Sequence, residues 1–172
     1  MHSHSGLTLL ELLMTISILL LLVTLGAPAI TSIQKNLQLR GAAETSYFAL
    51  QQARSSAITQ NIDITVAFKA GKTWCAALSD NGECDCSIAQ QCKLNGVEHK
   101  VSFVDYHFVE LSKVNFGQDS LTVFDANRGL AVGHAGSLIF SDGGRQLKLI
   151  LSNMGRVRIC AIDAPLGGYS KC

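Results

Sequence analysis

Hydrophobic and polar residues divide this chain into stretches of different character. Residues 7–33 are almost entirely apolar; Glu11 is the one charged residue among them, and the next charge is Lys35. A helix over these 27 residues would be about 40 Å long, because each residue rises about 1.5 Å, and that length spans a bilayer with tilt. We therefore expect residues 7–33 to form a transmembrane helix.

The helical pattern continues beyond the apolar run. Apolar side chains recur every three or four residues in the next segment, namely Ala43, Tyr47, Leu50, Ala53 and Ala57. This spacing places them on one face of a helix, which we expect to pack against a sheet. Residues 34–60 are thus predicted to form the second half of one long helix, which ends near Gln60-Asn61.

From Ile62 the pattern changes to the alternation that is typical of strands. Residues 62–68 and 73–78 are predicted to be strands joined by a turn. Further β-rich segments, separated by Gly, Asn and Asp, are 97–109, 113–116, 121–124, 137–140, 146–151 and 157–162. The pattern predicts an α+β fold, in which one long N-terminal helix packs on an antiparallel β-sheet and residues 61–172 form one globular domain.

Six cysteines follow the apolar run, and an even number in a domain beyond a membrane span indicates disulfides, which form in oxidising compartments. They are Cys75, Cys84, Cys86, Cys92, Cys160 and Cys172. Structural zinc prefers paired C-x2-C units, and the single C-x-C here has no matched second pair, so we expect no metal site.

The sequence alone leaves many disulfide connectivities open. We expect Cys160 and Cys172 to tie the C-terminal tail back to the last strand. The other four cysteines should pair among themselves. Cys84 and Cys86 should not pair with each other, because they are too close in sequence for an unstrained bridge.

Candidate catalytic residues are scattered. The histidines of the β-rich domain, His99, His107 and His134, lie apart in the sequence. The segment 133–137 lacks the G-x-S-x-G order of a nucleophile elbow. These features indicate a protein that is not an enzyme and that needs no cofactor.

The charge is distributed unevenly, although the whole chain carries a formal net charge of only +1. Residues 1–142 hold 9 Lys and Arg against 12 Asp and Glu, whereas residues 143–172 hold five basic residues against Asp163 alone. The five are Arg145, Lys148, Arg156, Arg158 and Lys171. A basic end segment of this kind can be the electrostatic footprint of a polyanion.

Two of these cations fall on one predicted strand. Side chains alternate along a strand, so Arg156 and Arg158 should point to solvent while Val157 and Ile159 point to the core. The two guanidiniums would be about 7 Å apart, a spacing that matches consecutive phosphates of one DNA strand. Arginine suits forked contacts to phosphate. The alternative is that both residues only keep a solvent-exposed face soluble.

The N-terminal segment resembles the type III signal of type IV pilins and pseudopilins, since Gly6 ends a polar leader and Glu11 follows five residues later. An ordinary secretory signal would need a basic n-region and a small-x-small cleavage site, and neither is clear here. The resemblance implies that a prepilin peptidase cleaves residues 1–6 and methylates Leu7. It also implies that Glu11 and Pro28 serve filament assembly, with Pro28 bending the helix.

The chain as a whole resembles the FimT/GspH group of minor pilins and pseudopilins. Gly155-Arg156-Val157-Arg158 is similar to the Gly-Arg-x-Arg motif of FimT proteins that bind DNA in natural transformation. The resemblance implies that Arg156 and Arg158 contact double-stranded DNA and that Gly155 sets the preceding turn. Lys148, Arg145 and Lys171 would steer the duplex from the flanks.

This resemblance also implies partners and a location. The subunit would lie in the inner membrane by a single span, with its domain in the periplasm, and would then join other pilins in a filament at the cell surface. The alternative within the same group is a GspH-like pseudopilin, a structural component of a type II secretion tip with no role in DNA binding.

Overall fold

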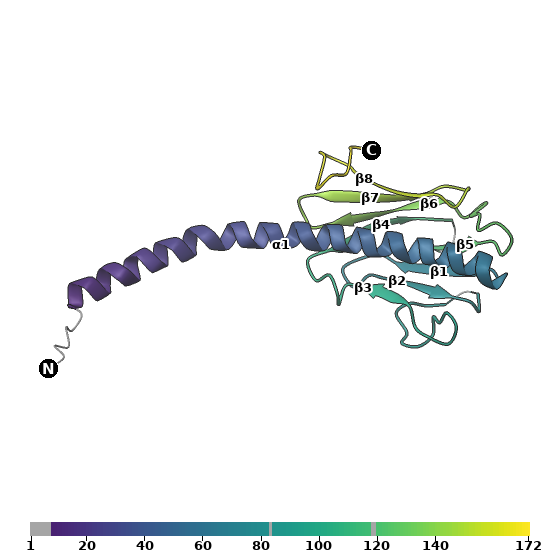
Figure 1. The fold of residues 1–172 in the computed structure, drawn as a ribbon, viewed down its shortest axis with the longest axis horizontal. Coiled ribbons are helices and arrows are strands. Elements are labelled where there is room, and N and C mark those ends of the chain that lie inside the picture. The colour runs from purple at the N-terminus through teal and green to yellow at the C-terminus, as the bar shows by residue number, and fades with distance from the viewer. Residues whose placement is uncertain (1–7, 83, 118–119) are drawn as a thin grey trace. The chain divides into compact units, whose positions relative to one another are not determined.

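The computed structural model describes residues 8–82, 84–117 and 120–172, and only the backbone of residues 26–29. Gly6 and Leu7 therefore lie outside the described residues. One helix, α1 (Leu9–Gln60), precedes all the strands (Figure 1). The strands are β1 (Ile64–Lys69), β2 (Cys75–Ser79), β3 (Lys100–Ser102), β4 (Glu110–Asn115), β5 (Leu121–Phe124), β6 (Gly136–Ser141), β7 (Gln146–Leu151) and β8 (Val157–Ala161). The predicted long helix, continuous to Gln60, is confirmed.

The chain divides into two compact units, residues 1–35 and 36–172. In the first unit, α1 is apolar and exposed, with a mean hydropathy of 2.4, so its length and composition allow it to cross a membrane. The hydroxyls of Thr15, Ser17 and Thr24 donate to carbonyls three or four residues earlier, at 2.8–3.0 Å. These polar groups are thus satisfied within the helix, as a lipid environment requires.

The second unit contains two four-stranded sheets. Their strand orders are β3-β2-β1-β5 and β4-β6-β7-β8, and every pair is antiparallel. The second half of α1 packs on them (Figure 1). The predicted face of this helix is buried: Ala43, Leu50, Ala53 and Ala57 have no exposed surface, and Tyr47 is half-buried.

Trp74 lies at the centre of the core, where it is fully buried. Its indole Nε1 donates to the carbonyl of Val109 at 2.7 Å, and its ring meets that of Phe140 edge-on with centroids 5.2 Å apart. Trp74 precedes β2 of one sheet and Phe140 belongs to β6 of the other. This aromatic pair therefore joins the two sheets.

The predicted β-rich segment 97–109 is mostly wrong. Only Lys100–Ser102 forms a strand. The chain then turns, because Asp105 N donates to Ser102 O at 3.1 Å, Tyr106 N to Phe103 O at 3.2 Å and Val109 N to Tyr106 O at 3.0 Å. Apolar residues in this segment pack from turns rather than from a strand, which a pattern of hydrophobicity cannot distinguish.

The outer faces of the two sheets differ. A loop between β2 and β3 is fixed by the disulfides Cys75–Cys86 and Cys84–Cys92, and with Ala77 these cysteines form a second buried cluster. This loop covers the outer face of the β3-β2-β1-β5 sheet. On the β4-β6-β7-β8 sheet, most of the corresponding side chains are half-exposed or exposed, and Ser137 and Cys160 are buried.

The C-terminal tail is fastened at its end. Cys160 on β8 is joined to Cys172, the pairing that the sequence predicts. The backbone of Ala161 receives a hydrogen bond from Cys172 N and donates one to Ser170 O, both at 2.9 Å. The Tyr169 hydroxyl donates to Glu44 Oε1 at 2.5 Å, so the tail is also attached to α1.

Candidate nucleic-acid interface

The predicted turn before β8 is confirmed, and Gly155 occupies its sharpest position. Gly155 has a φ of +71°, which lies in the left-handed region that glycine adopts without strain. Gly155 N donates to Ser152 O at 2.9 Å, and Ser152 N donates to Arg156 O at 3.0 Å. Arg156 N also donates to the Ser152 hydroxyl at 3.2 Å. These bonds fix the backbone immediately before the two arginines.

Two neighbouring elements support this turn. Arg54 on α1 donates from Nη1 to the carbonyl of Gly155 at 3.3 Å. Ala131, in the connection between β5 and β6, donates its backbone N–H to Asn153 O at 2.9 Å. Hydrogen bonds from α1 and from the β5–β6 connection therefore hold the turn in place, and with it the start of β8.

Arg156 and Arg158 are both exposed, whereas Val157 between them is buried and Ile159 is half-buried. The alternation that the sequence predicts is thus present. Arg158 lies on β8 opposite Ile150 of β7. Within the described part of the chain, neither arginine belongs to an ion pair. Their positive charges are accordingly available to an anion from outside.

The other predicted cations lie at different places. Lys148 is half-exposed on β7 opposite Cys160, on the same side of the sheet as Arg158. Lys171 is exposed in the tail, and its backbone forms an isolated β-bridge with Ala161 at the end of β8. The structure thus brings Lys148 close to the Gly-Arg-x-Arg segment, while Lys171 lies beyond the opposite end of that strand.

Arg145 is not brought together with Arg156 and Arg158. It lies at the start of β7, roughly 20 Å from the turn at the other end of that strand. Its Nε and Nη2 are 3.0 and 2.9 Å from Oδ2 of the buried Asp142. Burial raises the pKa of Asp142, but hydrogen bonds from Gly144 N, Arg145 N and the Arg145 side chain, together with the guanidinium charge, hold that pKa below its ordinary value. Asp142 therefore remains ionised and offsets the charge of Arg145.

Two exposed basic residues near this region were missed from the sequence. Lys113 lies on β4, in a strand whose neighbour cannot be read from the sequence. Arg128 precedes the loop that supports the turn, and its backbone N–H donates to Asp125 Oδ1 at 2.8 Å. The available signal was the alternation within residues 113–116, which places Lys113 opposite in direction to Val114.

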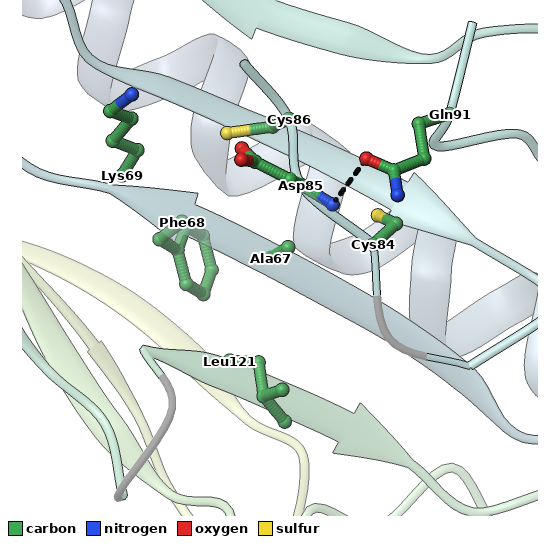
Figure 2. Close-up of a pocket in the computed structure, with 8 residues that line it drawn as sticks. All are labelled: Ala67, Phe68, Lys69, Cys84, Asp85, Cys86, Gln91 and Leu121. Carbon is green, nitrogen blue, oxygen red and sulfur yellow. Dashed lines mark hydrogen bonds between the residues drawn. The ribbon is translucent and has the colours of Figure 1, made fainter. Parts of the chain in front are cut away.

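An open cavity of about 550 Å³ lies beside the cysteine loop, between Ala67–Lys69 of β1 and Cys84–Cys86 (Figure 2). The carboxylate of Asp85 accepts from Ser87 N at 2.8 Å, and Gln91 Oε1 accepts from Asp85 N at 3.1 Å. Cys84 and Cys86, which line the cavity, both form disulfides. The lining groups thus bind one another and hold the loop in shape.

Within residues 8–82, 84–117 and 120–172, no group of three or more His, Cys, Asp or Glu side chains is placed to hold a metal ion.

Comparisons with known proteins identify the family. The family model described as type II transport protein GspH matches residues 42–155, which is more than half of the chain. The type IV minor pilin FimU of Pseudomonas aeruginosa strain PAO1 is a similar solved structure, with 18% sequence identity and a TM-score of 0.49, over 72% of this chain and 97% of that one. No curated protein matches the chain.

The family match runs from the second half of α1 through β7 to the turn at Gly155, and it ends before Arg156 and β8. Membership of this family implies association with other pilins in a filament. The apolar N-terminal part of α1 fits a membrane anchor for such a subunit before assembly. The chain belongs to the GspH family of minor pilins and pseudopilins.

Proposed function

We propose that this protein is a minor type IV pilin that binds extracellular double-stranded DNA without sequence preference and promotes its uptake in natural transformation. The observation that carries the proposal is the pair Arg156 and Arg158. Arg156 is exposed immediately before β8 and Arg158 is exposed on it, directly after a turn fixed by hydrogen bonds. Neither is engaged by a carboxylate in the described residues.

The geometry of this pair fits a phosphate backbone. Side chains two residues apart on a strand are separated by about 7 Å, close to the spacing of phosphates along one DNA strand. Each guanidinium can present a fork of N–H donors to phosphate oxygens. Contacts to phosphate position a protein on DNA but carry no sequence information, so binding should be non-specific.

The subunit would reach its site by the route that pilins share. After removal of residues 1–6 by a prepilin peptidase and methylation of Leu7, α1 would hold the protein in the inner membrane, with its domain in the periplasm. Glu11 and Pro28 would then serve its incorporation into the filament, where the basic surface meets DNA at the cell surface.

A second candidate function is a structural one. The matching family model carries the description of a type II transport protein. This favours a GspH-like pseudopilin at the tip of a type II secretion system, in which Arg156 and Arg158 have no DNA to bind.

A salt titration of DNA binding separates the two candidates. The full chain in a non-ionic detergent is titrated with duplexes of two unrelated sequences at several salt concentrations. Each phosphate contact contributes about −0.9 to the slope of log K against log salt. Replacing both residues, Arg156→Gln with Arg158→Gln, should weaken binding to both duplexes alike and flatten the slope by about two units.

The matched control replaces two exposed lysines elsewhere, Lys72→Gln with Lys100→Gln, which removes the same charge from the other sheet and its turn. The control should leave the slope nearly unchanged. Equal affinity of the folded arginine double variant and the wild type would reject the contacts of Arg156 and Arg158 with DNA. A wild-type chain that binds no duplex would reject the DNA-uptake function and favour the secretion pseudopilin.

A further inference from the structure

We propose that the DNA-binding surface is not confined to the Gly-Arg-x-Arg segment but crosses the sheet from β8 to β4, with Lys148 and Lys113 as direct phosphate contacts. This inference rests on the proposed function and extends it. The surface, here named the outer face, consists of two rows of side chains. They are Lys113, Ile139, Lys148 and Cys160 in one row, and Asn115, Ser137, Ile150 and Arg158 in the other.

The strand register establishes these rows. Lys113 of β4 lies opposite Ile139 of β6, Ile139 lies opposite Lys148 of β7, and Lys148 lies opposite Cys160 of β8. Residues directly opposite each other in antiparallel strands project to the same side of the sheet. Lys113 and Lys148 therefore project on the same side, although 35 residues separate them in the sequence.

Burial identifies this side as the outer one. Leu138 and Leu149, which alternate with the row residues on β6 and β7, are completely buried in the core. Lys113 is exposed, and Ile139 and Lys148 are half-exposed. The three cations Lys113, Lys148 and Arg158 thus leave the sheet on the face opposite the core.

The spacing of the cations suits an extended anion. Neighbouring strands are about 4.8 Å apart, so Lys113 and Lys148, two strands apart, are separated by about 10 Å at the backbone. Arg158 is a diagonal neighbour of Lys148, at about 7–8 Å. With Arg156 immediately before β8, four cations follow a path across this face of the sheet.

The charge of the outer face is uncompensated along this path. The two rows contain no carboxylate. The nearest acids are Glu110, which lies opposite Ser141 in the next row of the same face, and Asp142, which is paired with Arg145. Lys113 and Lys148 take part in no ion pair within the described residues. A polyanion is the complementary partner.

The chemistry of the remaining row residues points to a duplex. Single-stranded nucleic acid is held largely by bases stacked on aromatic side chains. Neither of the two rows contains an aromatic side chain. The outer face can thus contact a paired backbone through its phosphates but gives unpaired bases no ring to stack on.

The test is the salt dependence of DNA binding by Lys113→Gln, measured on the full chain in detergent beside the wild type and Lys100→Gln. We expect Lys113→Gln to flatten the slope of log K against log salt by about one unit for a duplex, and Lys148→Gln to do the same. Lys100→Gln, an exposed lysine on β3 of the other sheet, should leave the slope unchanged. Lys113→Arg, which keeps the charge, should have the salt slope of the wild type. A single-stranded oligonucleotide should bind the wild type more weakly than the duplex does.

The outcomes for the two proposals are distinct. If Arg156→Gln/Arg158→Gln binds duplex more weakly while Lys113→Gln binds it as the wild type does, the extended surface is wrong and the proposed function stands. If the arginine double variant keeps the wild-type affinity for duplex while Lys113→Gln binds more weakly, the Gly-Arg-x-Arg contacts are rejected and the sheet surface is supported. A wild-type protein that binds no duplex rejects both. If Lys113→Gln keeps its affinity but disappears from sheared filaments, Lys113 belongs to a subunit contact and the extended surface is wrong.

Discussion

Gly155 lies so close to Gly129 that a Cβ atom on Gly155 would come within 2.2 Å of the Gly129 carbonyl oxygen. Both glycines have positive φ angles, +71° and +61°. The turn before β8 therefore packs on the backbone of the β5–β6 connection, with Arg54 of α1 beside it. The glycine of the Gly-Arg-x-Arg segment is thus required both by its conformation and by this contact.

Gly155→Ala should accordingly displace the turn and weaken DNA binding. A non-glycine residue in the left-handed region costs about 1–3 kcal/mol, and here a backbone clash adds to that cost. Gly143→Ala is the matched control, because Gly143 also has a positive φ, +89°, but has open space where the Cβ would be. Thermal unfolding should show a larger loss of stability for Gly155→Ala, and only that variant should bind duplex more weakly. Equal effects of the two substitutions would contradict the packing argument.

The Cys160–Cys172 disulfide should contribute about 3 kcal/mol to the free energy of unfolding, since it closes a short loop in the unfolded chain. Replacing both cysteines by serine should lower the midpoint of urea unfolding accordingly. Ser170→Ala, an exposed change in the same tail, serves as control and should alter stability little. A serine variant as stable as the wild type would show that the hydrogen bonds of the tail hold it without the disulfide.

The sequence predicts the features that depend on local pattern. The helix face of Leu50, Ala53 and Ala57 follows from a period of three to four residues, and it is buried. The directions of Arg156 and Val157 follow from the alternation of a strand, and they are as expected. Local periodicity specifies which way a side chain points, whatever the strand pairs with.

Features that depend on pairing between distant segments could not be predicted. The row from Lys113 to Lys148 exists because β4 pairs with β6 and β6 with β7, with a register shift between Leu111 and Lys113. The engagement of Arg145 by Asp142 depends on the fold of the β6–β7 hairpin. A charge count gives Arg145 the same weight as Arg156, and only the tertiary structure separates them.

Glu11→Ala should leave membrane insertion intact but prevent incorporation into filaments. Glu11 lies in the first turn of α1, where its backbone N–H donates to the hydroxyl of Thr8 at 3.3 Å. A carboxylate in an apolar helix needs an opposite charge, which the methylated N-terminal amine of a neighbouring subunit would supply. The measurement compares the subunit in membrane and sheared-filament fractions, with Glu11→Asp as the charge-preserving control. Normal amounts of Glu11→Ala in the filaments would exclude this role.

Stability should also depend on pH through the tail. The Tyr169 hydroxyl donates to Glu44 Oε1, and Arg40 lies 3.7 Å from the same oxygen. Burial, with the hydrogen bond to Glu44 and its negative charge, raises the pKa of Tyr169 from 10.0 to about 12. A phenol with a raised pKa in the folded state stabilises the protein fully below pH 10, and this stabilisation is lost as the pH rises towards 12.

Tyr169→Phe removes this titration while keeping the ring against the core. The wild type should therefore lose more stability than Tyr169→Phe between pH 9.5 and pH 11.5, roughly the window set by the two pKa values. Tyr47 and Tyr106 are present in both proteins, so their contributions cancel in the comparison. Urea unfolding at a series of pH values, with brief exposure to alkali to preserve the disulfides, gives the two curves. Parallel curves would show that the Tyr169–Glu44 bond does not couple the tail to α1 in solution.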